Sequence, residues 1–301
     1  MMADRAFIAG FFVIGIMAVS AFLTLTAGRD LPADYLQMQV ADPVQGERVF
    51  IAAGCASCHL APDAKWDGNA PPPLPGGRRF QSPFGTFIAP NISTHPEAGL
   101  GNWSDRAIAR AVVLGVSPEG AHYYPAFPYA SYQTADSRDI ADLIAYLRTL
   151  PPVESIAPPH EVGFPFNIRR SLAVWKFLFT DPTPILPDPL PAELARGRYL
   201  VETLGHCGEC HTPRNPLGGL DRRRWLGGAA HPSGDGRIPN ITPAGLIWSE
   251  ADIAAYLKTG FTPEFDVAGG EMVEVIANTA RLSDADRQAI ASYLKAIPPV
   301  Q

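Results

Sequence analysis

The sequence predicts an all-α protein in which two similar domains follow an N-terminal apolar helix. Three observations support this fold class: a long uncharged apolar run near the start, a C-x-x-C-H pentapeptide that occurs twice, and a series of short motifs that recur in the same order in both halves. The length of 301 residues also fits two domains, since domains commonly contain about 100 to 200 residues.

The composition narrows the class of protein. Pro (31 residues) and Gly (27 residues) are frequent and show no Gly-X-Y period, which indicates a globular chain with many turns and long loops. Hydrophobic residues make up 47% and charged residues 18%, so the chain can build apolar cores. The net charge of -6 argues against a nucleic-acid partner, because phosphate binding requires a concentrated basic surface.

The N-terminal element is an uncharged run from Ala6 to Gly28, bounded by Arg5 and Arg29. About 20 apolar residues in a helix span the hydrocarbon core of a bilayer. A cleavable signal peptide has a shorter apolar region, followed by a small-x-small cleavage site, and no convincing site follows this run. Residues 1–30 are therefore expected to be an uncleaved transmembrane anchor, with a signal peptide as the alternative.

The two C-x-x-C-H motifs carry the clearest chemistry. In this pattern two thiols add to the vinyl groups of one porphyrin, and the adjacent His becomes the proximal iron ligand. A thioredoxin-like thiol pair or a zinc site would leave both histidines unexplained. The expected cofactors are two covalently attached haems c, which are attached outside the cytoplasm, so the part after the anchor is expected in the periplasm. The attachment residues are Cys55, Cys58, Cys207 and Cys210, with His59 and His211 on the two irons.

Other motifs recur around the C-x-x-C-H pairs. Each pair follows a helix-like segment that ends in Gly, and each is followed by Pro-Asn-Ile, by Trp-Ser-Asp or Trp-Ser-Glu with Ser as a helix N-cap, and by a Tyr-Leu helix ending in Pro-Pro-Val. The copies are Val44–Ala53 and Ala192–Leu204, Pro90–Ile92 and Pro239–Ile241, Trp103–Asp105 and Trp248–Glu250, and Ala145–Val153 and Ser292–Val300. This repetition predicts two tandem class I cytochrome c domains over residues 31–157 and 191–301.

The duplicated motifs resemble those of the membrane-anchored multihaem cytochrome c subunits of bacterial periplasmic dehydrogenases that act on alcohols, gluconate and related substrates. The better-known members carry three haems, so this chain is similar to a dihaem relative. The resemblance implies an electron relay from a dehydrogenase catalytic subunit to a quinone, a soluble cytochrome or a terminal oxidase. It also implies a location in the bacterial inner (cytoplasmic) membrane with the haem domains facing the periplasm. It does not identify the substrate.

The sixth iron ligands differ between the two domains. Met272, in a Gly-Gly-Glu-Met loop, is the only Met after Met38, and the resembling family carries its axial Met in the same loop. Aligning the two Trp-Ser motifs places Phe127 opposite Met272, and Phe cannot bind iron. Family members often have Met there or at the position of Ala135. The remaining candidates in the first domain are His122, which is preferred, then His95, with His160 and Met38 further away. The competing interpretation is a five-coordinate haem.

Residues 158–190 are rich in Pro and form the expected linker. Within it, Asn167–Phe179 places Leu172, Trp175 and Phe179 on one helical face. We expect this helix to pack across the domain interface, and the alternative is a docking surface for the dehydrogenase or the membrane.

Three functional classes remain. An electron-transfer subunit is favoured, because we identify no catalytic constellation of the Ser/His/Asp or paired-carboxylate type. An enzyme could use an open iron in the first domain for peroxide, thiosulfate or nitrogen-oxide chemistry. A sensor would require an output domain, and the sequence contains none.

Overall fold

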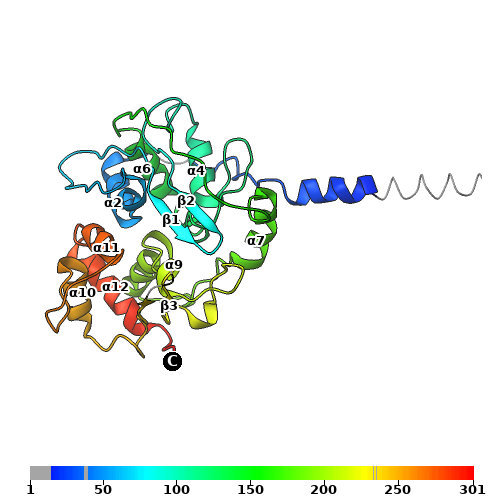
Figure 1. The fold of residues 1–301 in the computed structure, drawn as a ribbon. Helices are drawn as coiled ribbons and strands as arrows, with labels where there is room; N and C mark the ends of the chain where they lie inside the picture. The colour runs from blue at the N-terminus through cyan, green and yellow to red at the C-terminus, as the bar shows by residue number, and fades with distance from the viewer. Residues whose placement is uncertain (1–14, 37–39, 233, 235) are drawn as a thin grey trace, which may run out of the picture.

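The computed structural model describes residues 15–36, 40–232, 234 and 236–301. Residues 1–14 of the expected anchor lie outside the described part. Residues 15–25 are helical and project away from the folded body (Figure 1). Within the described ranges, no helix combines the length and the apolar character needed to cross a membrane.

The first domain contains five helices and one hairpin in the described part of the chain. Its elements are α2 (Pro43–Ala52), α3 (Cys55–His59), β1 (Arg79–Ser82), β2 (Gly85–Ile88), α4 (Asp105–Leu114), α5 (Tyr129–Tyr132) and α6 (Ser137–Leu147). The helix start at α4 is the one predicted by Trp-Ser-Asp, because the side chain of Ser104 accepts a hydrogen bond from the backbone N–H of Ala107 at 3.2 Å.

The second domain repeats this order. Its elements are α8 (Ala192–Arg198), the π-helix η2 (Tyr199–Leu204), α9 (Gly208–His211), the short 3-10 helix η3 (Arg222–Arg224), β3 (Ala229–Ala230), β4 (Arg237–Ile238), α10 (Glu250–Thr259), α11 (Met272–Thr279) and α12 (Asp284–Ala296). Ser249 caps α10 in a reciprocal arrangement with Asp252. The predicted helix Ala192–Leu204 is therefore helical throughout but changes to π geometry at Tyr199.

The prediction of an all-α fold holds only in the coarser form of a mostly helical fold. Each domain has one short antiparallel sheet after its C-x-x-C-H motif. The sheet is β1–β2 in the first domain and β3–β4 in the second. The sequence predicts no strand in either stretch. These strands are too short to show the alternating apolar pattern by which strands are recognised in a sequence.

In each domain the first and last helices cross at a glycine. A Cβ atom at Gly46 of α2 would lie 1.9 Å from the carbonyl oxygen of Asp142 in α6. A Cβ atom at Gly197 of α8 would lie 2.0 Å from the carbonyl oxygen of Ala289 in α12. Each pair of backbones can approach this closely only because neither glycine has a side chain. The first C-x-x-C-H motif follows α2 in the chain, and the second follows α8 and η2.

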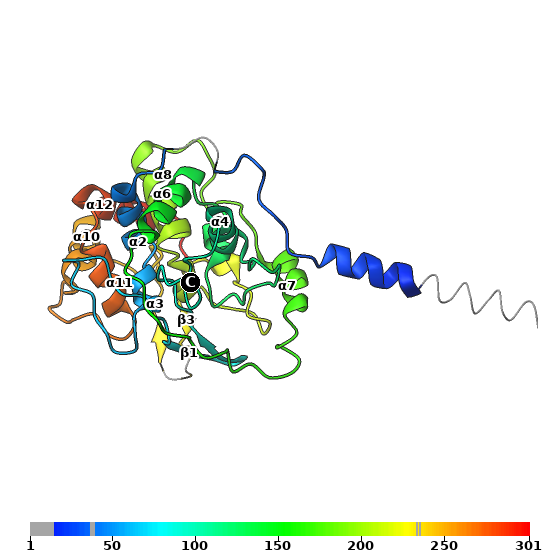
Figure 2. The same ribbon diagram turned by 90° about the horizontal axis from the view of Figure 1, so that it is seen from above.

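The two domains share one hydrophobic core cluster, in which Phe50 and Ile140 of the first domain belong together with Leu200 and Tyr293 of the second. Polar contacts also join them: the Tyr199 hydroxyl donates to the carboxylate of Asp139 at 2.7 Å. Figure 1 and Figure 2 show the two halves side by side as one body.

The linker helix packs against both domains, as predicted. It begins at Leu172 rather than Asn167, because Arg169–Ser171 forms the 3-10 turn η1 before α7 (Leu172–Phe179). The indole N–H of Trp175 donates to the carbonyl of Leu217 in the second domain at 2.8 Å. On the first domain, Nζ of Lys176 donates to the carbonyl of Leu114 at 2.6 Å, at the end of α4.

Candidate functional site

The two C-x-x-C-H motifs occupy equivalent places in the two domains. The first forms α3 and follows Gly54, which has a φ of 63°. In the second, α9 begins after Cys207, and the equivalent left-handed residue is His206 with a φ of 38°. Gly205 was the expected helix terminator, yet its φ is -75°. The turn into the second motif is thus made by a non-glycine residue, and His is one of the few such residue types that adopt positive φ with some frequency.

None of the four motif cysteines is paired in a disulfide. Burial raises the pKa of Cys55 and of Cys207 to about 12 and the pKa of Cys58 to about 11. Thiols of thioredoxin-like redox pairs have lowered pKa values, because positive groups or helix N-termini stabilise the thiolate. The raised pKa values of all four cysteines therefore do not fit that alternative.

Each motif histidine is oriented by one backbone carbonyl. Nδ1 of His59 donates to the carbonyl of Pro90 at 2.8 Å, and Nδ1 of His211 donates to the carbonyl of Pro239 at 2.8 Å. A carbonyl oxygen only accepts, so Nδ1 carries the proton and Nε2 keeps a lone pair. Burial lowers the pKa of both histidines, which keeps them neutral. A neutral imidazole held through its other nitrogen is the form that binds a metal.

The recurring Pro-Asn-Ile motif connects this carbonyl to the end of each domain. The side-chain amide of Asn91 donates to the carbonyl of Val153 at 2.8 Å, and that of Asn240 donates to the carbonyl of Val300 at 2.7 Å. Pro-Asn-Ile and Pro-Pro-Val therefore recur together because they are hydrogen-bonded partners. Together they hold the proline carbonyl that orients the motif histidine.

These paired histidines and thiols have the donor chemistry and orientation that two haems c require. The cytochrome c family profile matches residues 43–151. A dihaem c-type cytochrome of Cereibacter sphaeroides is 54% identical over 257 residues, which cover 85% of this chain and 86% of the relative. The chain belongs to the dihaem c-type cytochromes. The cytochrome carries two haems c. Their attachment at the two C-x-x-C-H motifs stays a prediction.

Two further relatives are subunits of dehydrogenases. The fructose dehydrogenase cytochrome subunit of Gluconobacter japonicus is 38% identical over 262 residues, covering 84% of the cytochrome and 52% of that subunit. The cytochrome c subunit of a quinone-type alcohol dehydrogenase of Gluconobacter oxydans is 35% identical over 303 residues, covering 95% of the cytochrome and 59% of that subunit. The cytochrome thus spans little more than half the length of these two subunits.

Met272 is the first residue of α11. Its side chain is partly buried and packs against the core cluster. The preceding loop is fixed at Glu271, whose carboxylate lies 3.1 Å from Nε2 of His231 and has its pKa lowered by that contact. Ligation of the second haem by Met272 stays a prediction.

The first domain has an aromatic cluster at the position aligned with Met272. The ring of Phe127 lies 5.9 Å from that of Tyr132, 6.3 Å from Tyr123 and 6.5 Å from Tyr129, measured between centroids. The hydroxyl of Tyr132 donates to the carbonyl of Ala53, just before the first motif, at 3.0 Å. The first domain thus has an aromatic cluster at the sequence position that Met272 has in the second domain.

His122 is buried, with 5% of its surface exposed. Its Nε2 donates to the carbonyl of Thr26 at 3.1 Å, so Nδ1 carries a lone pair, and this buried atom has no hydrogen-bond partner within the described residues. Burial lowers the His122 pKa and keeps the ring neutral. If His122 binds iron while keeping its bond to Thr26, Nδ1 is the ligating atom. This ligation stays a prediction.

The other candidates in the first domain are placed differently. Nδ1 of His95 accepts the backbone N–H of Ala98 at 3.1 Å, and Nδ1 of His160 accepts that of Ile88 at 3.0 Å. Both rings therefore use their Nδ1 lone pair within the protein, and Nε2 carries the proton. Met38 lies outside the described residues.

Each C-x-x-C-H motif lies at the domain interface and contacts an element of the other domain. The side-chain amide of Asn278 in α11 donates to the hydroxyl of Ser57, inside the first motif, at 2.7 Å. The hydroxyl of Ser131 in α5 donates to Glu209, inside the second motif, at 3.5 Å. The ring of His206 lies 5.7 Å from that of Tyr132. None of these three contacts could be predicted from the sequence, because no local pattern shows which surfaces of the two domains face each other.

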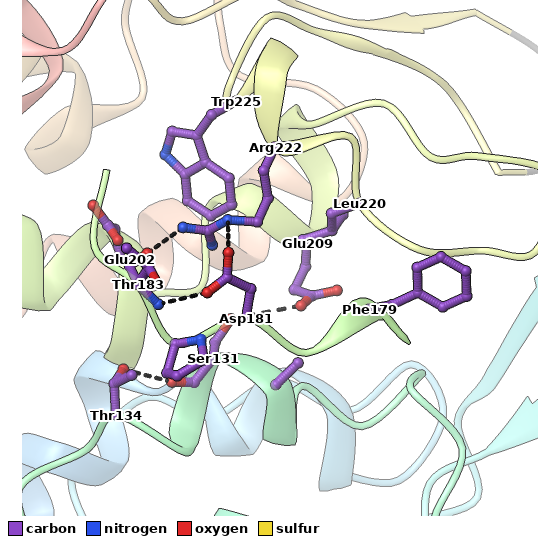
Figure 3. A pocket seen from close by; sticks show the side chains of 12 residues that line it. Ser131, Thr134, Phe179, Asp181, Thr183, Glu202, Glu209, Leu220, Arg222 and Trp225 are labelled. Atoms are coloured by element: carbon purple, nitrogen blue, oxygen red, sulfur yellow. Dashed lines mark hydrogen bonds and ion pairs between the residues drawn. The ribbon is translucent and has the colours of Figure 1, made fainter. Parts of the chain in front are cut away.

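A small cavity lies beside this interface (Figure 3). Ser131 and Thr134 of the first domain line it together with Glu202, Arg222 and Trp225 of the second. The ring of Trp225 lies against Gly208 of the second motif, and its indole N–H is a buried donor without a protein partner among the described residues. Burial raises the pKa of Glu202, to which the Tyr293 hydroxyl donates a hydrogen bond. The cavity thus adds polar and titratable groups next to the second haem-attachment site.

Proposed function

We propose that the cytochrome relays electrons between its two haems as the cytochrome subunit of a dehydrogenase. The observation that carries this proposal is that each C-x-x-C-H motif contacts the other domain. Ser57 of the first motif bonds to Asn278 of α11, and Glu209 of the second motif bonds to Ser131 of α5. Each haem, once attached, supplies an iron that accepts and releases one electron. The two motifs belong to domains that share one hydrophobic core cluster, so an electron can pass within one chain without a second docking step.

The relatives support a dehydrogenase as the electron donor. Two of them are cytochrome subunits of fructose and alcohol dehydrogenases. The proposed acceptor is a quinone, a soluble cytochrome or a terminal oxidase.

The proposed location is the bacterial cytoplasmic membrane, with both haem domains in the periplasm. The support is the uncharged run Ala6–Gly28 and the exposure of its described side chains, such as Ile16 at 65% and Leu25 at 82%. Full-length protein should stay in the membrane pellet after alkaline carbonate extraction. Release into the supernatant, with a mature N-terminus near Arg29, would favour the signal-peptide alternative.

The proposed axial ligands are His59 and His122 in the first domain, the latter through Nδ1, and His211 and Met272 in the second. A relay benefits from a fixed sixth ligand, because a coordination change in each cycle slows electron transfer. The runner-up is an enzyme with an open first haem, and the aromatic lining around Phe127 favours it. Binding of carbon monoxide to one of the two ferrous haems would support that alternative.

The relay is tested by flash reduction of the full-length dihaem protein with a photoexcited ruthenium complex. We expect a second kinetic phase in which absorbance moves from one haem spectrum to the other at a rate independent of protein concentration. The single-haem protein Cys207→Ala/Cys210→Ala is the control and should lack this phase. A phase whose rate rises with protein concentration would mean that electrons pass between molecules, and the relay proposal would be wrong.

A further inference from the structure

An exposed apolar surface lies on the linker between the two domains. Phe177 is 82% exposed, Leu178 58% and Val174 47%, all on α7. The segment just before α7 adds Phe164 at 81% and Ile168 at 49%. We call these five residues the α7 patch. Contiguous apolar patches on soluble surfaces mark interaction sites, whereas single exposed apolar residues are ordinary.

The α7 patch is fixed to the foot of the N-terminal helix. Nη1 of Arg170 donates to the carbonyl of Leu23 at 2.9 Å and lies 3.1 Å from the hydroxyl of Thr26. Nε2 of His122 donates to the Thr26 carbonyl, and Thr26 is only 6% exposed. In Figure 1 and Figure 2, α7 lies at the edge of the body from which residues 15–25 project. These bonds therefore fix the position of the α7 patch relative to the foot of the N-terminal helix.

The basic side chains of this region are engaged by the protein. Nζ of Lys176 donates to the carbonyls of Leu114 and Gly115 at 2.6 and 2.7 Å, and its ammonium lies 4.3 Å from the ring centroid of Tyr129. The guanidinium of Arg169 lies over the ring of Tyr124 at 5.1 Å. The outward surface of α7 is thus apolar rather than cationic. Its complement is an uncharged apolar phase and not an acidic protein surface.

We propose that the α7 patch rests in the interfacial layer of the lipid bilayer that holds the N-terminal helix. The inference rests on the proposed anchor, because the patch is continuous with the side of the body where that helix leaves. An apolar helix face at the foot of a spanning helix would sink into the boundary between headgroups and acyl chains. A single helix leaves the body free to tilt, and this second contact removes that freedom.

The consequence is a defined orientation of both haem domains. Because α7 contacts the second domain through Trp175 and the first through Lys176, a membrane contact at α7 positions the two domains together. The membrane contact therefore determines which of the two haems faces the membrane. That haem is the one that faces an electron acceptor dissolved in the membrane.

The test is photocrosslinking of the full-length dihaem protein in nanodiscs of phosphatidylcholine. Benzoylphenylalanine replaces Phe177 in one variant and Phe265, which is 90% exposed on the second domain, in the matched control. We expect phospholipid adducts at position 177 and their loss at position 265. Equal adduct formation at both positions, or no lipid adduct at position 177 in protein that remains membrane-bound, would overturn the proposal.

Further variants distinguish lipid contact by the α7 patch from membrane attachment by the N-terminal helix. With the photoreactive residue at Ile168, adding Phe177→Asp and Leu178→Asp should abolish the lipid adducts while haem content and carbonate-resistant membrane association stay unchanged. Adding Phe265→Asp instead should leave the adducts in place. Unchanged adducts after Phe177→Asp and Leu178→Asp would contradict the patch. Loss of the unmodified full-length protein from the membrane pellet would contradict the anchor instead.

Discussion

The two domains are alike around the C-x-x-C-H motif and differ at the position aligned with Met272. Each orients its motif histidine through a proline carbonyl at 2.8 Å, and each ties that turn to the end of its own domain through an asparagine amide. At the aligned position, the second domain offers Met272 at the start of α11, whereas the first domain has Phe127 in an aromatic cluster.

The difference shows which features a duplicated domain can lose. The attachment side depends on backbone hydrogen bonds and close helix packing, so several residues must change together before it alters. The sixth ligand depends on one side chain. A single substitution can remove it while the fold stays intact.

The largest expected effect is loss of one haem from either domain. Cys55→Ala with Cys58→Ala, and separately Cys207→Ala with Cys210→Ala, should each leave one covalent haem, because each motif binds its own porphyrin. Mass spectrometry of the intact protein measures this. Loss of both haems in each variant would mean that the domains do not mature independently, and zinc without haem would contradict the assignment of both motifs.

The next effect concerns the shared helix crossing. Gly46→Ala and Gly197→Ala should each destabilise the holo-protein by about 3 kcal/mol, because both new methyl groups would overlap a backbone carbonyl oxygen. Thermal unfolding measures the cost. Gly163→Ala is the control, since no atom lies within 4 Å of a Cβ atom there. A large cost in only one domain would show that the two crossings are not equivalent.

A smaller effect should follow from changing the residue at the predicted sixth-ligand position of each domain. Met272→Ala should lower the potential of one haem by on the order of 0.1 V, since axial ligands set haem potentials over a span of about 0.8 V, and should remove the thioether-to-iron charge-transfer band. Ala135→Met in the first domain should have the opposite effect on the other haem. Spectroelectrochemistry resolves both changes. A Met272→Ala protein with unaltered potentials would require a different ligand.

The smallest effect is expected at the hydrogen bond between the first motif and α11. Asn278→Ala should cost about 1 kcal/mol of stability, the usual net value of one hydrogen bond, and should slow electron exchange between the haems. Ser57→Ala removes the other partner of the same bond. The double variant should therefore cost less than the sum of the two single variants in chemical denaturation. Additive costs would indicate that the two side chains do not interact.

Much of the attachment site could be predicted from the sequence, because its chemistry depends on local patterns. The C-x-x-C-H spacing identified the thiols and histidines, and the Trp-Ser motifs marked the starts of α4 and α10 correctly. The linker helix was placed, although its first turn at Arg169 is a 3-10 helix. These features each depend on residues within a few positions of one another.

The rest depends on contacts between distant segments. The bond between Ser57 and Asn278 joins residues 221 positions apart, and no periodicity predicts such a pair. The bond from His122 to Thr26 spans 96 positions; it determines which nitrogen of His122 has a free lone pair. The short strands β3 and β4 arise from pairing of only two residues each. Tertiary packing, rather than local propensity, determines all of these.

The central claim is that two similar domains hold haems with different sixth ligands. The electron paramagnetic resonance spectrum of the ferric full-length protein tests it most directly, recorded for the parent, Met272→Ala and His122→Ala. We predict two distinct low-spin signals, a His/Met signal altered only by Met272→Ala and a bis-histidine signal altered only by His122→Ala. A high-spin signal for one haem in the parent would support the open first haem in place of His122. Two His/Met signals in the parent would contradict the account.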